Sequence, residues 1–359
     1  MPRLSLLVVL LLGACVRGLL YAVPSVHATL STRPELATSI SSFRRLEEGV
    51  FLFQSTGSPY AGDVYHQPPL LFALLYPVLQ VAPASLQYFI KCTVFITADL
   101  LLAMGFDRLS LAASMMCVAA GTYLSVYPFF LMVPIVLLLR SVKESSLKSI
   151  GIKCLVVFGV WLGLLFYLSW NLTGGWEFLE ETYAWVAKYS DLTPNIGIFW
   201  YFFMEVFDRF IPYFLFVMHL HPVIYVVPIY LRLAHRPQAY ACALIGIFSL
   251  FQAYPSFGDF GFFLSMLALH PKTIMTIENR FVYVLGLGVA TCMLPVMWFL
   301  WLFPASGNAN FFYNQTLVYQ IFNTQIITAF VGATMKRDKD VDKYRTSHLK
   351  ERKAVDARE

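Results

Sequence analysis

The chain has 359 residues, of which 58% are hydrophobic and only 13% are charged. Ordinary globular domains carry about 25% charged residues, so this composition excludes an ordinary soluble protein. The net charge of +5 does not indicate a nucleic acid partner, because the basic residues lie between apolar blocks and in the tail and do not alternate with aromatic residues. The six cysteines form no C-x-x-C pair, so neither a zinc knuckle nor a redox motif is indicated.

Long apolar blocks predict repeated membrane crossings, because about 20 apolar residues span a bilayer as one helix. The first block, 4–22, contains Arg17 and has no clear small-x-small cleavage site, so we expect an uncleaved signal anchor. Further blocks lie at 68–83, 86–104, 109–139, 151–170, 198–231, 238–254, 259–270, 281–303 and 311–333. We therefore expect an all-α polytopic membrane protein, with about nine to eleven transmembrane helices in a single domain, 1–335.

Two of these blocks, 109–139 and 198–231, are too long for one straight crossing and contain prolines. Proline interrupts the hydrogen-bond ladder of a helix. Within a membrane, other protein groups or a water-lined cavity must then satisfy the freed backbone groups. The sequence thus predicts broken or re-entrant helices in both blocks.

Short loops rich in Lys and Arg indicate the orientation, because such loops stay in the cytosol. The charged tail, 336–359, is expected to be cytosolic and disordered. The first loop, 23–67, and the acidic, aromatic segment 171–197 then face the lumen. The basic loop residues are Arg140, Lys143, Lys148 and Lys153, then Arg232, His235 and Arg236, then Lys272 and Arg280.

The first lumenal loop contains a stretch in which apolar and charged residues alternate at helical spacing. Phe43, Leu46, Val50 and Phe51 are the apolar members. This pattern is typical of a short amphipathic helix lying at the membrane interface. The Gly- and Pro-rich run 57–69 that follows turns the chain back into the membrane.

The segment 191–205 is the strongest candidate for contact with a ligand. Asp191 or Thr193 is placed to cap a helix that begins near Pro194, and the free N–H groups of such a helix would favour a phosphate. The aromatic run that follows suits acyl chains, while an ordinary capped helix in an aromatic belt is the alternative interpretation. The candidate binding residues are Asp191, Asn195, Phe199, Trp200 and Tyr201.

Two further lumenal turns carry candidate residues. Asp259 follows the turn 254–258 at a helix start, where a helix cap is the alternative interpretation. Asn308, Asn310 and Phe311 belong to a loop of small polar residues before a helix. The two amides suit a sugar or a partner's backbone, and turn formation is the alternative.

Two charged residues are expected inside the membrane, where charge is costly and faces protein or water. Asp99 stands near the centre of its block with Lys91 on roughly the same face, and Glu205 is spaced to pair along one helix edge with Arg209. Asp99 is expected either to pair with a group of a neighbouring subunit or to contact a substrate, and the sequence does not distinguish these two roles.

The sequence contains no arrangement typical of self-contained hydrolysis. It has no G-x-S-x-G and no H-E-x-x-H. His219 and His221 are two residues apart, so on a helix they point away from each other and make a poor metal pair. We therefore expect no catalytic residue, no metal and no cofactor in this chain.

Several short runs resemble the PIG-U family, a subunit of the GPI-anchor transamidase, and they occur in the family's order over most of the chain. The most specific is D-L-T-P-N-I-G-I-F-W-Y-F-F at 191–203. The others are G-S-P-Y at 57–60, Y-L-S-V-Y-P at 123–128, Y-P-S-F-G-D at 254–259, L-P-V-M-W at 294–298 and N-F-F-Y at 310–313.

The resemblance implies a place and a set of partners. The transamidase joins proproteins to a preformed GPI lipid in the lumen of the endoplasmic reticulum. Its cysteine nucleophile belongs to a separate caspase-like, PIG-K-like subunit. A PIG-U-like chain is then a non-catalytic, multi-pass membrane subunit that helps recognise the GPI lipid, the C-terminal attachment signal of the proprotein, or both. PIG-T-, PIG-S- and GAA1-like subunits complete the implied partners.

The same resemblance implies a GT-C-like architecture, because PIG-U-like proteins are similar to lumenal, dolichol-phosphate-mannose-dependent mannosyltransferases. An enzyme of that class is the alternative function, with Glu35 as the candidate carboxylate in the first loop. A packing subunit that binds no substrate is a third possibility. One departure stands out: family members carry a further loop and helices where Asp107 and Arg108 here join two apolar blocks directly.

Overall fold

The computed structural model describes residue 15 and residues 23–80, 110–143 and 146–356. Within these ranges the regular structure is helical, with no strand. The chain separates into two compact units. Unit 1 comprises Met1–Met132 and Leu139–Asn195, and unit 2 comprises Val133–Leu138 and Ile196–Glu359. The predicted signal anchor, 4–22, lies almost wholly outside the described residues, and the single domain 1–335 stays a prediction.

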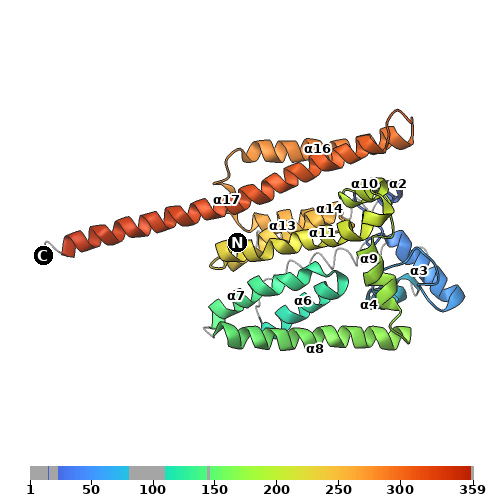
Figure 1. The fold of residues 1–359 in the computed structure, drawn as a ribbon, viewed down its shortest axis with the longest axis horizontal. Helices are drawn as coiled ribbons and strands as arrows, with labels where there is room; N and C mark the ends of the chain where they lie inside the picture. Colours follow the sequence, from blue (N-terminus) through green and yellow to red (C-terminus); the bar gives the residue numbers. More distant parts are fainter. Residues whose placement is uncertain (1–14, 16–22, 81–109, 144–145, 357–359) are drawn as a thin grey trace. The chain divides into compact units, whose positions relative to one another are not determined.

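Unit 1 contains the first predicted loop and the helices that follow it (Figure 1). Its helices are α2 (Pro24–Leu30), α3 (Phe43–Thr56), α4 (Pro69–Gln80), α6 (Leu111–Leu124), the 3-10 helix η2 (Tyr127–Leu131), α8 (Leu147–Thr173), the π-helix η3 (Glu180–Ala184) and α9 (Trp185–Lys188). The residues of α7 (Met132–Lys143) divide between the two units.

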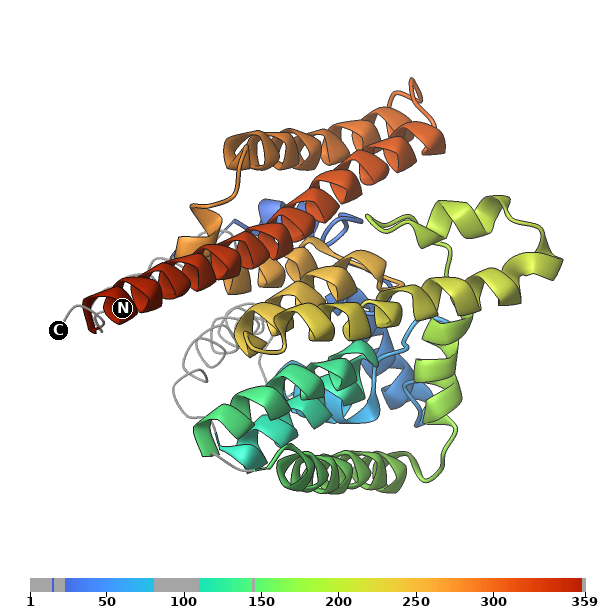
Figure 2. The ribbon, with the colours of Figure 1, turned by 60° about the vertical axis from the view of Figure 1, so that its left-hand side comes forward.

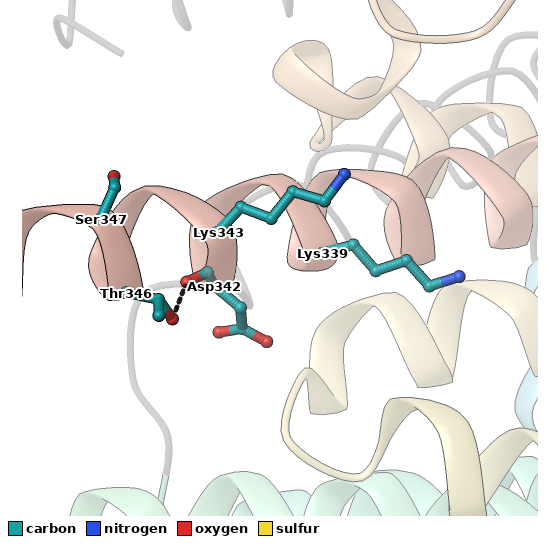
Figure 3. A pocket seen from close by; sticks show the side chains of 5 residues that line it. All are labelled: Lys339, Asp342, Lys343, Thr346 and Ser347. Atoms are coloured by element: carbon teal, nitrogen blue, oxygen red, sulfur yellow. Dashed lines mark hydrogen bonds between the residues drawn. The ribbon is translucent and has the colours of Figure 1, made fainter. Parts of the chain in front are cut away.

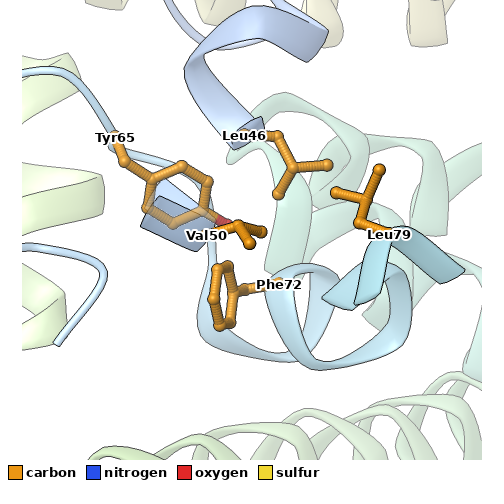
Figure 4. Close-up of a cluster of buried hydrophobic side chains, with 5 residues drawn as sticks. All are labelled: Leu46, Val50, Tyr65, Phe72 and Leu79. Atoms are coloured by element: carbon orange, nitrogen blue, oxygen red, sulfur yellow. The ribbon is translucent and has the colours of Figure 1, made fainter. Parts of the chain in front are cut away.

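Helix α3 forms where the sequence predicts an amphipathic helix. Gly57 ends it in the left-handed conformation (φ 83°) and donates its N–H to the Phe53 carbonyl oxygen, a role that suits glycine. Its apolar face buries Leu46 and Val50 against Tyr65, Phe72 and Leu79 (Figure 4). The ring of Tyr65 lies so near α3 that a Cβ at Gly49 would approach it to 2.7 Å. The position of α3 at a membrane interface stays a prediction.

Unit 2 contains helices from the second half of the chain (Figure 2). They are α10 (Phe199–Glu205), the 3-10 helix η4 (Asp208–Phe210), α11 (Ile211–Ile224), α12 (Val226–Leu233), α13 (Pro237–Phe251), α14 (Phe257–Ala268), α15 (Pro271–Ile274), α16 (Arg280–Leu302) and α17 (Ala309–Asp356).

Three helical stretches are long and apolar enough to cross a membrane: Leu147–Thr173, Asp208–Leu233 and Arg280–Leu302. Four shorter apolar helices accompany them, Leu111–Leu124, Tyr127–Ser141, Pro237–Phe251 and Phe257–Ala268. An all-helical membrane protein is thereby confirmed at this coarse level. Within the described residues these helices do not confirm the predicted nine to eleven crossings, and that number stays a prediction.

The two long apolar blocks are interrupted in the structure. Block 109–139 breaks at Ser125, whose backbone is extended, before the 3-10 helix η2. Block 198–231 breaks at Val206, also extended, and again at Tyr225 between α11 and α12. Prolines lie in the first turns of η2 and α11, where the missing N–H costs no hydrogen bond. Proline thus stands at the start of η2 and of α11.

Helices α16 and α17 form an antiparallel hairpin in unit 2 (Figures 1 and 2). A Cβ at Gly286 of α16 would lie 2.1 Å from the Phe322 ring of α17, so glycine allows the close approach. Pro295 interrupts the hydrogen-bond ladder of α16. The Gln315 amide of α17 donates to the nearby Ala290 carbonyl oxygen at 3.0 Å. The carbonyl oxygen that Pro295 leaves without a helical donor is that of Thr291, so the bond from Gln315 lies one residue from this break and ties the two helices together.

Helix α17 continues through the tail that the sequence predicts to be disordered. The structure is helical as far as Asp356. The chain has no Gly or Pro after Gly332, and an established helix propagates through Lys, Arg and Glu at little cost. Ion pairs tie the start of this stretch to unit 2: Lys336 pairs with Glu278 at 2.6 Å, and Asp338 pairs with Arg236 and with His235.

Candidate functional site

Asp191 joins the segment 191–195 to the first loop of unit 1. Its Oδ2 accepts hydrogen bonds from the Ser39 hydroxyl (2.6 Å) and from Arg45 Nη2 of α3 (2.5 Å). Its Oδ1 accepts from the Thr193 backbone N–H at 2.8 Å. Burial raises the pKa of Asp191, but the bonds from Ser39 and Thr193 and the charge of Arg45 outweigh burial and lower it overall. Asp191 is therefore an anion fixed by its neighbours at neutral pH.

The expected helix near Pro194 does not form. The next helix, α10, begins at Phe199, and its N-cap residue Ile198 makes no side-chain cap. The physical reason is that Asp191 closes a local turn through Thr193 and bonds the first loop, so it does not cap a helix. The prediction of a helix start near Pro194 is therefore wrong, and contact of this segment with a ligand stays a prediction.

Asn195 is a buried structural residue of unit 1. Only 2% of it is exposed. Its Nδ2 donates to the Tyr189 hydroxyl (3.1 Å) and to the Thr193 carbonyl oxygen (3.3 Å). Asn195 thus holds the backbone of its own segment.

An aromatic cluster gathers at one end of unit 2, and we use that name for Trp200, Tyr201, Trp298, Trp301, Phe312 and Tyr313. Trp200 is fully buried. Its ring centroid lies 5.7 Å from that of Tyr313, 6.1 Å from Phe312 and 6.4 Å from Trp301. Tyr201 stacks on Tyr313 at 4.6 Å. Residues from α10, α16 and α17 thus meet in one packed cluster.

Helix α17 also fixes the backbone that leads into this cluster. The Tyr313 hydroxyl donates to the Ile198 carbonyl oxygen at 3.3 Å, and Gln320 Nε2 donates to the Ile196 carbonyl oxygen at 2.9 Å. Tyr313 and Gln320 are seven residues apart, so they lie on one face of the helix. Phe199 is buried and packs on His219, and it belongs to the core.

Next to the aromatic cluster, the hairpin between α16 and α17 presents an uncharged surface. The stretch 296–316 contains no charged residue. Phe303 is 70% exposed and Phe311 is 54% exposed, and Asn310 is exposed as well. Asn308 accepts a hydrogen bond from the Phe311 N–H at 3.3 Å, close to the start of α17. Of the residues predicted here, Asn310 and Phe311 are therefore free to meet a ligand, while Asn308 shapes the turn.

The other predicted residues have structural surroundings. Asp259 forms a capping box with Ser256 at the start of α14, in agreement with its alternative interpretation. Glu205 is exposed at the end of α10, hydrogen-bonds Tyr201, and precedes the apolar stretch Asp208–Leu233. Asp99 lies outside the described residues. No group of His, Cys, Asp and Glu suited to a metal occurs in the described ranges.

Sequence reasoning missed several residues at these places. Trp298, Phe312 and Tyr313 stand in the runs L-P-V-M-W and N-F-F-Y, which were recognised as motifs without being assigned to a site. In unit 1, His66 stacks on Trp185 with centroids 3.9 Å apart, and its Nδ1 donates to the Glu181 carbonyl oxygen at 2.8 Å. The run Y-H-Q-P-P was the available signal for His66.

Glu35, the candidate carboxylate of the mannosyltransferase alternative, forms an ion pair with Arg33. Its two carboxylate oxygens accept bonds from Arg33 Nε (3.0 Å) and Nη2 (2.7 Å), and the residue is buried. A bidentate pair of this kind holds the carboxylate by charge-assisted bonds, so Glu35 is poorly placed to take a proton from a substrate.

Apolar helices long enough to span a membrane, with a buried aromatic cluster beside an uncharged exposed surface, define a helical membrane protein. The sequence profile described as GPI transamidase subunit PIG-U matches residues 11–106 and 92–319. The chain belongs to the PIG-U family, which confirms the resemblance.

Curated relatives extend the match over nearly the whole chain. The chain is 28% identical to the GPI transamidase component GAB1 of Saccharomyces cerevisiae, with 88% of this chain and 91% of the relative covered. It is 26% identical to the GPI-anchor transamidase component PIGU of Homo sapiens, with 93% and 94% covered. The latter alignment runs over 415 positions, so the human protein has residues with no counterpart here. The predicted departure at Asp107 and Arg108 lies outside the described residues and stays a prediction.

Proposed function

We propose that this protein is a non-catalytic subunit of the GPI transamidase in the membrane of the endoplasmic reticulum. In this role it helps recognise the GPI lipid, the C-terminal attachment signal, or both. Its relatives carry the names of transamidase components, and this is the observation that carries the proposal. A PIG-K-like subunit supplies the nucleophile, and PIG-T-, PIG-S- and GAA1-like subunits are the other partners.

The proposal includes a topology. Basic loops lie in the cytosol, and the segments 23–67, 171–197 and 304–310 lie in the lumen, as the distribution of Lys and Arg indicates. About nine to eleven crossings in a GT-C-like arrangement complete it. The three long apolar stretches support the membrane part of this topology.

We assign recognition of the GPI lipid or the attachment signal to the exposed residues beside the aromatic cluster, Phe303, Asn310 and Phe311, and we call these residues its edge. Phe303 and Phe311 are exposed and offer apolar contact to acyl chains or to the side chains of an attachment signal. The Asn310 amide offers a donor and an acceptor to a sugar or a peptide backbone. Trp200 and Phe312 are fully buried, so they act as positioning residues beneath this edge.

The test replaces exposed residues only. We expect Asn310→Ala with Phe311→Ala to reduce surface display of GPI-anchored protein in cells that lack their own PIG-U-like subunit. Co-purification of the other subunits should persist, because both side chains are exposed. Phe281→Ala, at an exposed position near the other end of α16, is the matched control. Normal display and normal GPI-lipid crosslinking in the double variant would refute the assignment of this edge.

The mannosyltransferase alternative is less favoured, because Glu35 is held by Arg33. Mannosyl transfer by the purified protein, abolished by Glu35→Gln, would reverse that ranking.

A further inference from the structure

Helix α8 buries one set of side chains and exposes another. Ile150, Cys154, Phe158 and Ser169 are buried within unit 1, where α8 packs on α4 and α6. A second set is apolar and 41–66% exposed, and it consists of Ile152, Leu155, Val156, Val160 and Leu164. Because α8 is long and apolar enough to cross a membrane, this exposed face is suited to contact acyl chains.

Aromatic rings continue this face at the end of α8. We define the aromatic ladder as Tyr167, Trp170, Trp176 and Phe178, whose consecutive ring centroids lie 6.1, 6.4 and 6.1 Å apart. Gly174 ends the helix in the left-handed conformation (φ 74°), a role that suits glycine, and Trp176 then lies beside Trp170. Phe178 is buried, whereas Trp170 is 37% exposed and Tyr167 and Trp176 are each 55% exposed. The ladder is thus fixed in unit 1 through Phe178 and exposed at its other three rings.

The charged residues around α8 give this surface a definite length. Lys148 and Lys153 are exposed near the start of α8, and the next charged residue in the chain is Glu177. Along the helix, Trp170 lies about 33 Å from Lys148 and about 26 Å from Lys153, at 1.5 Å per residue. The hydrocarbon core of a bilayer is about 30 Å thick, and lysine side chains at its boundary extend their ammonium groups into water. The spacing therefore fits one bilayer, with the lysines at one membrane–water interface and the ladder at the other.

The chemistry of the ladder suits the same position. Trp and Tyr combine an apolar ring with one polar group and are enriched at membrane–water interfaces. Beyond the ladder, Glu180 and Lys188 are each 64% exposed and pair with each other, as is typical of a surface in water. A protein partner would explain the exposed rings, but it would not explain their distance from Lys148 and Lys153.

The last part of α17 shows a surface of the opposite kind. There Lys339, Asp342, Lys343, Thr346 and Ser347 line a shallow hollow (Figure 3), and all five residues are exposed. Charged and hydroxyl-bearing side chains lose hydrogen bonds to water when they enter an apolar environment. This part of α17 is therefore a reference for a helix surface in water, and the uncharged stretch of α8 is not of that type.

We propose that the aromatic ladder anchors the end of α8 at the interface between the phospholipid headgroups and the acyl chains. The rings contact the upper part of the acyl chains, and the indole N–H groups of Trp170 and Trp176 are donors for phosphate or ester oxygens. Because the ladder continues into the buried Phe178, it fixes the depth of this part of unit 1 together with that of the helix. This contact is with the bilayer itself and does not depend on the substrate or the subunits that the complex binds.

The experiment measures membrane depth in the full chain, within its complex, in phospholipid nanodiscs. A fluorescent amino acid replaces Trp170 or Trp176, or, as the matched control, Trp161, which lies about 14 Å from Trp170 toward the middle of α8. At positions 170 and 176 we expect a quencher attached near the lipid headgroup to be about twofold or more stronger than one attached near the end of the acyl chain. The order should reverse at position 161. A probe at Thr346 should respond only to a quencher dissolved in water.

A second measurement identifies what covers the ladder. A benzophenone amino acid replaces Tyr167, and we expect its photo-adduct to form mainly with phospholipid. An adduct mainly with another subunit, or quenching at positions 170 and 176 that is absent or stronger from the deep quencher, would overturn the inference. The ladder belongs to this chain alone, so the same depths are expected for the chain reconstituted by itself. Failure to assemble with the other subunits would therefore count against the proposed function and not against the anchor.

Discussion

At the scale of single residues, the chemical type of a side chain was less informative than its hydrogen-bond partners and its burial. Asp191 was expected near a ligand, yet both of its oxygens are engaged by Ser39, Arg45 and Thr193. Trp200 was expected at a membrane boundary, yet it is fully buried. Both residues pack or bond within the protein, whereas Asn310 and Phe311 are exposed.

Asp191→Asn tests the contribution of these bonds to stability. Loss of the carboxylate charge should destabilise unit 1 by about 1.5–3 kcal/mol, the range for hydrogen bonds to charged groups. Because the folded-state pKa is lowered, the charged form stabilises the fold above the unfolded pKa of about 3.9. This contribution is lost as the pH falls through the folded pKa. Thermal unfolding in detergent from pH 7 downward should therefore show a difference that is constant near neutrality and vanishes in acid.

Asp63→Asn is the control, since Asp63 is exposed in the same unit. An equal loss of stability in both variants, or a difference that persists in strong acid, would contradict the role of Asp191.

At the scale of elements, α16 and α17 meet at a glycine and near a proline, two residues that are uncommon inside helices. Gly286 allows Phe322 to approach α16. Pro295 interrupts that helix, and next to the break Gln315 of α17 donates to the Ala290 carbonyl oxygen. We expect Gln315→Leu to lower the free energy of unfolding by about 0.6–1.7 kcal/mol, as for hydrogen bonds between membrane helices. Denaturation in mixed micelles measures the change.

Gln325→Leu provides the comparison, because Gln325 is exposed on the same helix. If both leucine variants are as stable as the parent, the bond from Gln315 to the Ala290 carbonyl oxygen contributes nothing.

At the scale of the whole molecule, the chain matches its family from residue 11 to residue 319, while the human relative has residues that this chain lacks. We expect the 359-residue chain to co-purify with the other transamidase subunits and to restore surface display in cells that lack their own PIG-U-like subunit. Flow cytometry and affinity purification measure the two outcomes. Assembly without display would indicate that the missing segment contributes to recognition. Failure of both would contradict the proposed role for this chain.

The class of molecule could be predicted from local sequence alone, because apolar blocks of about 20 residues have few uses outside a membrane. Local sequence was also enough to predict the family, through runs such as 191–203, and the existence of α3, whose apolar residues repeat at helical spacing. Proline positions in the blocks 109–139 and 198–231 were enough to predict that the helices there are interrupted. These features depend on local composition and periodicity.

Contacts between residues distant in the chain could not be predicted in this way and are known from the structure. The aromatic cluster joins Trp200 to residues about 100 positions away in α16 and α17, and no local pattern specifies such a pairing. Asp191 left its expected role as a helix cap because Ser39 and Arg45, distant in sequence, supply stronger partners for its charge. Burial, which separates the positioning residue Trp200 from the exposed Phe311, depends on the packing of several helices at once.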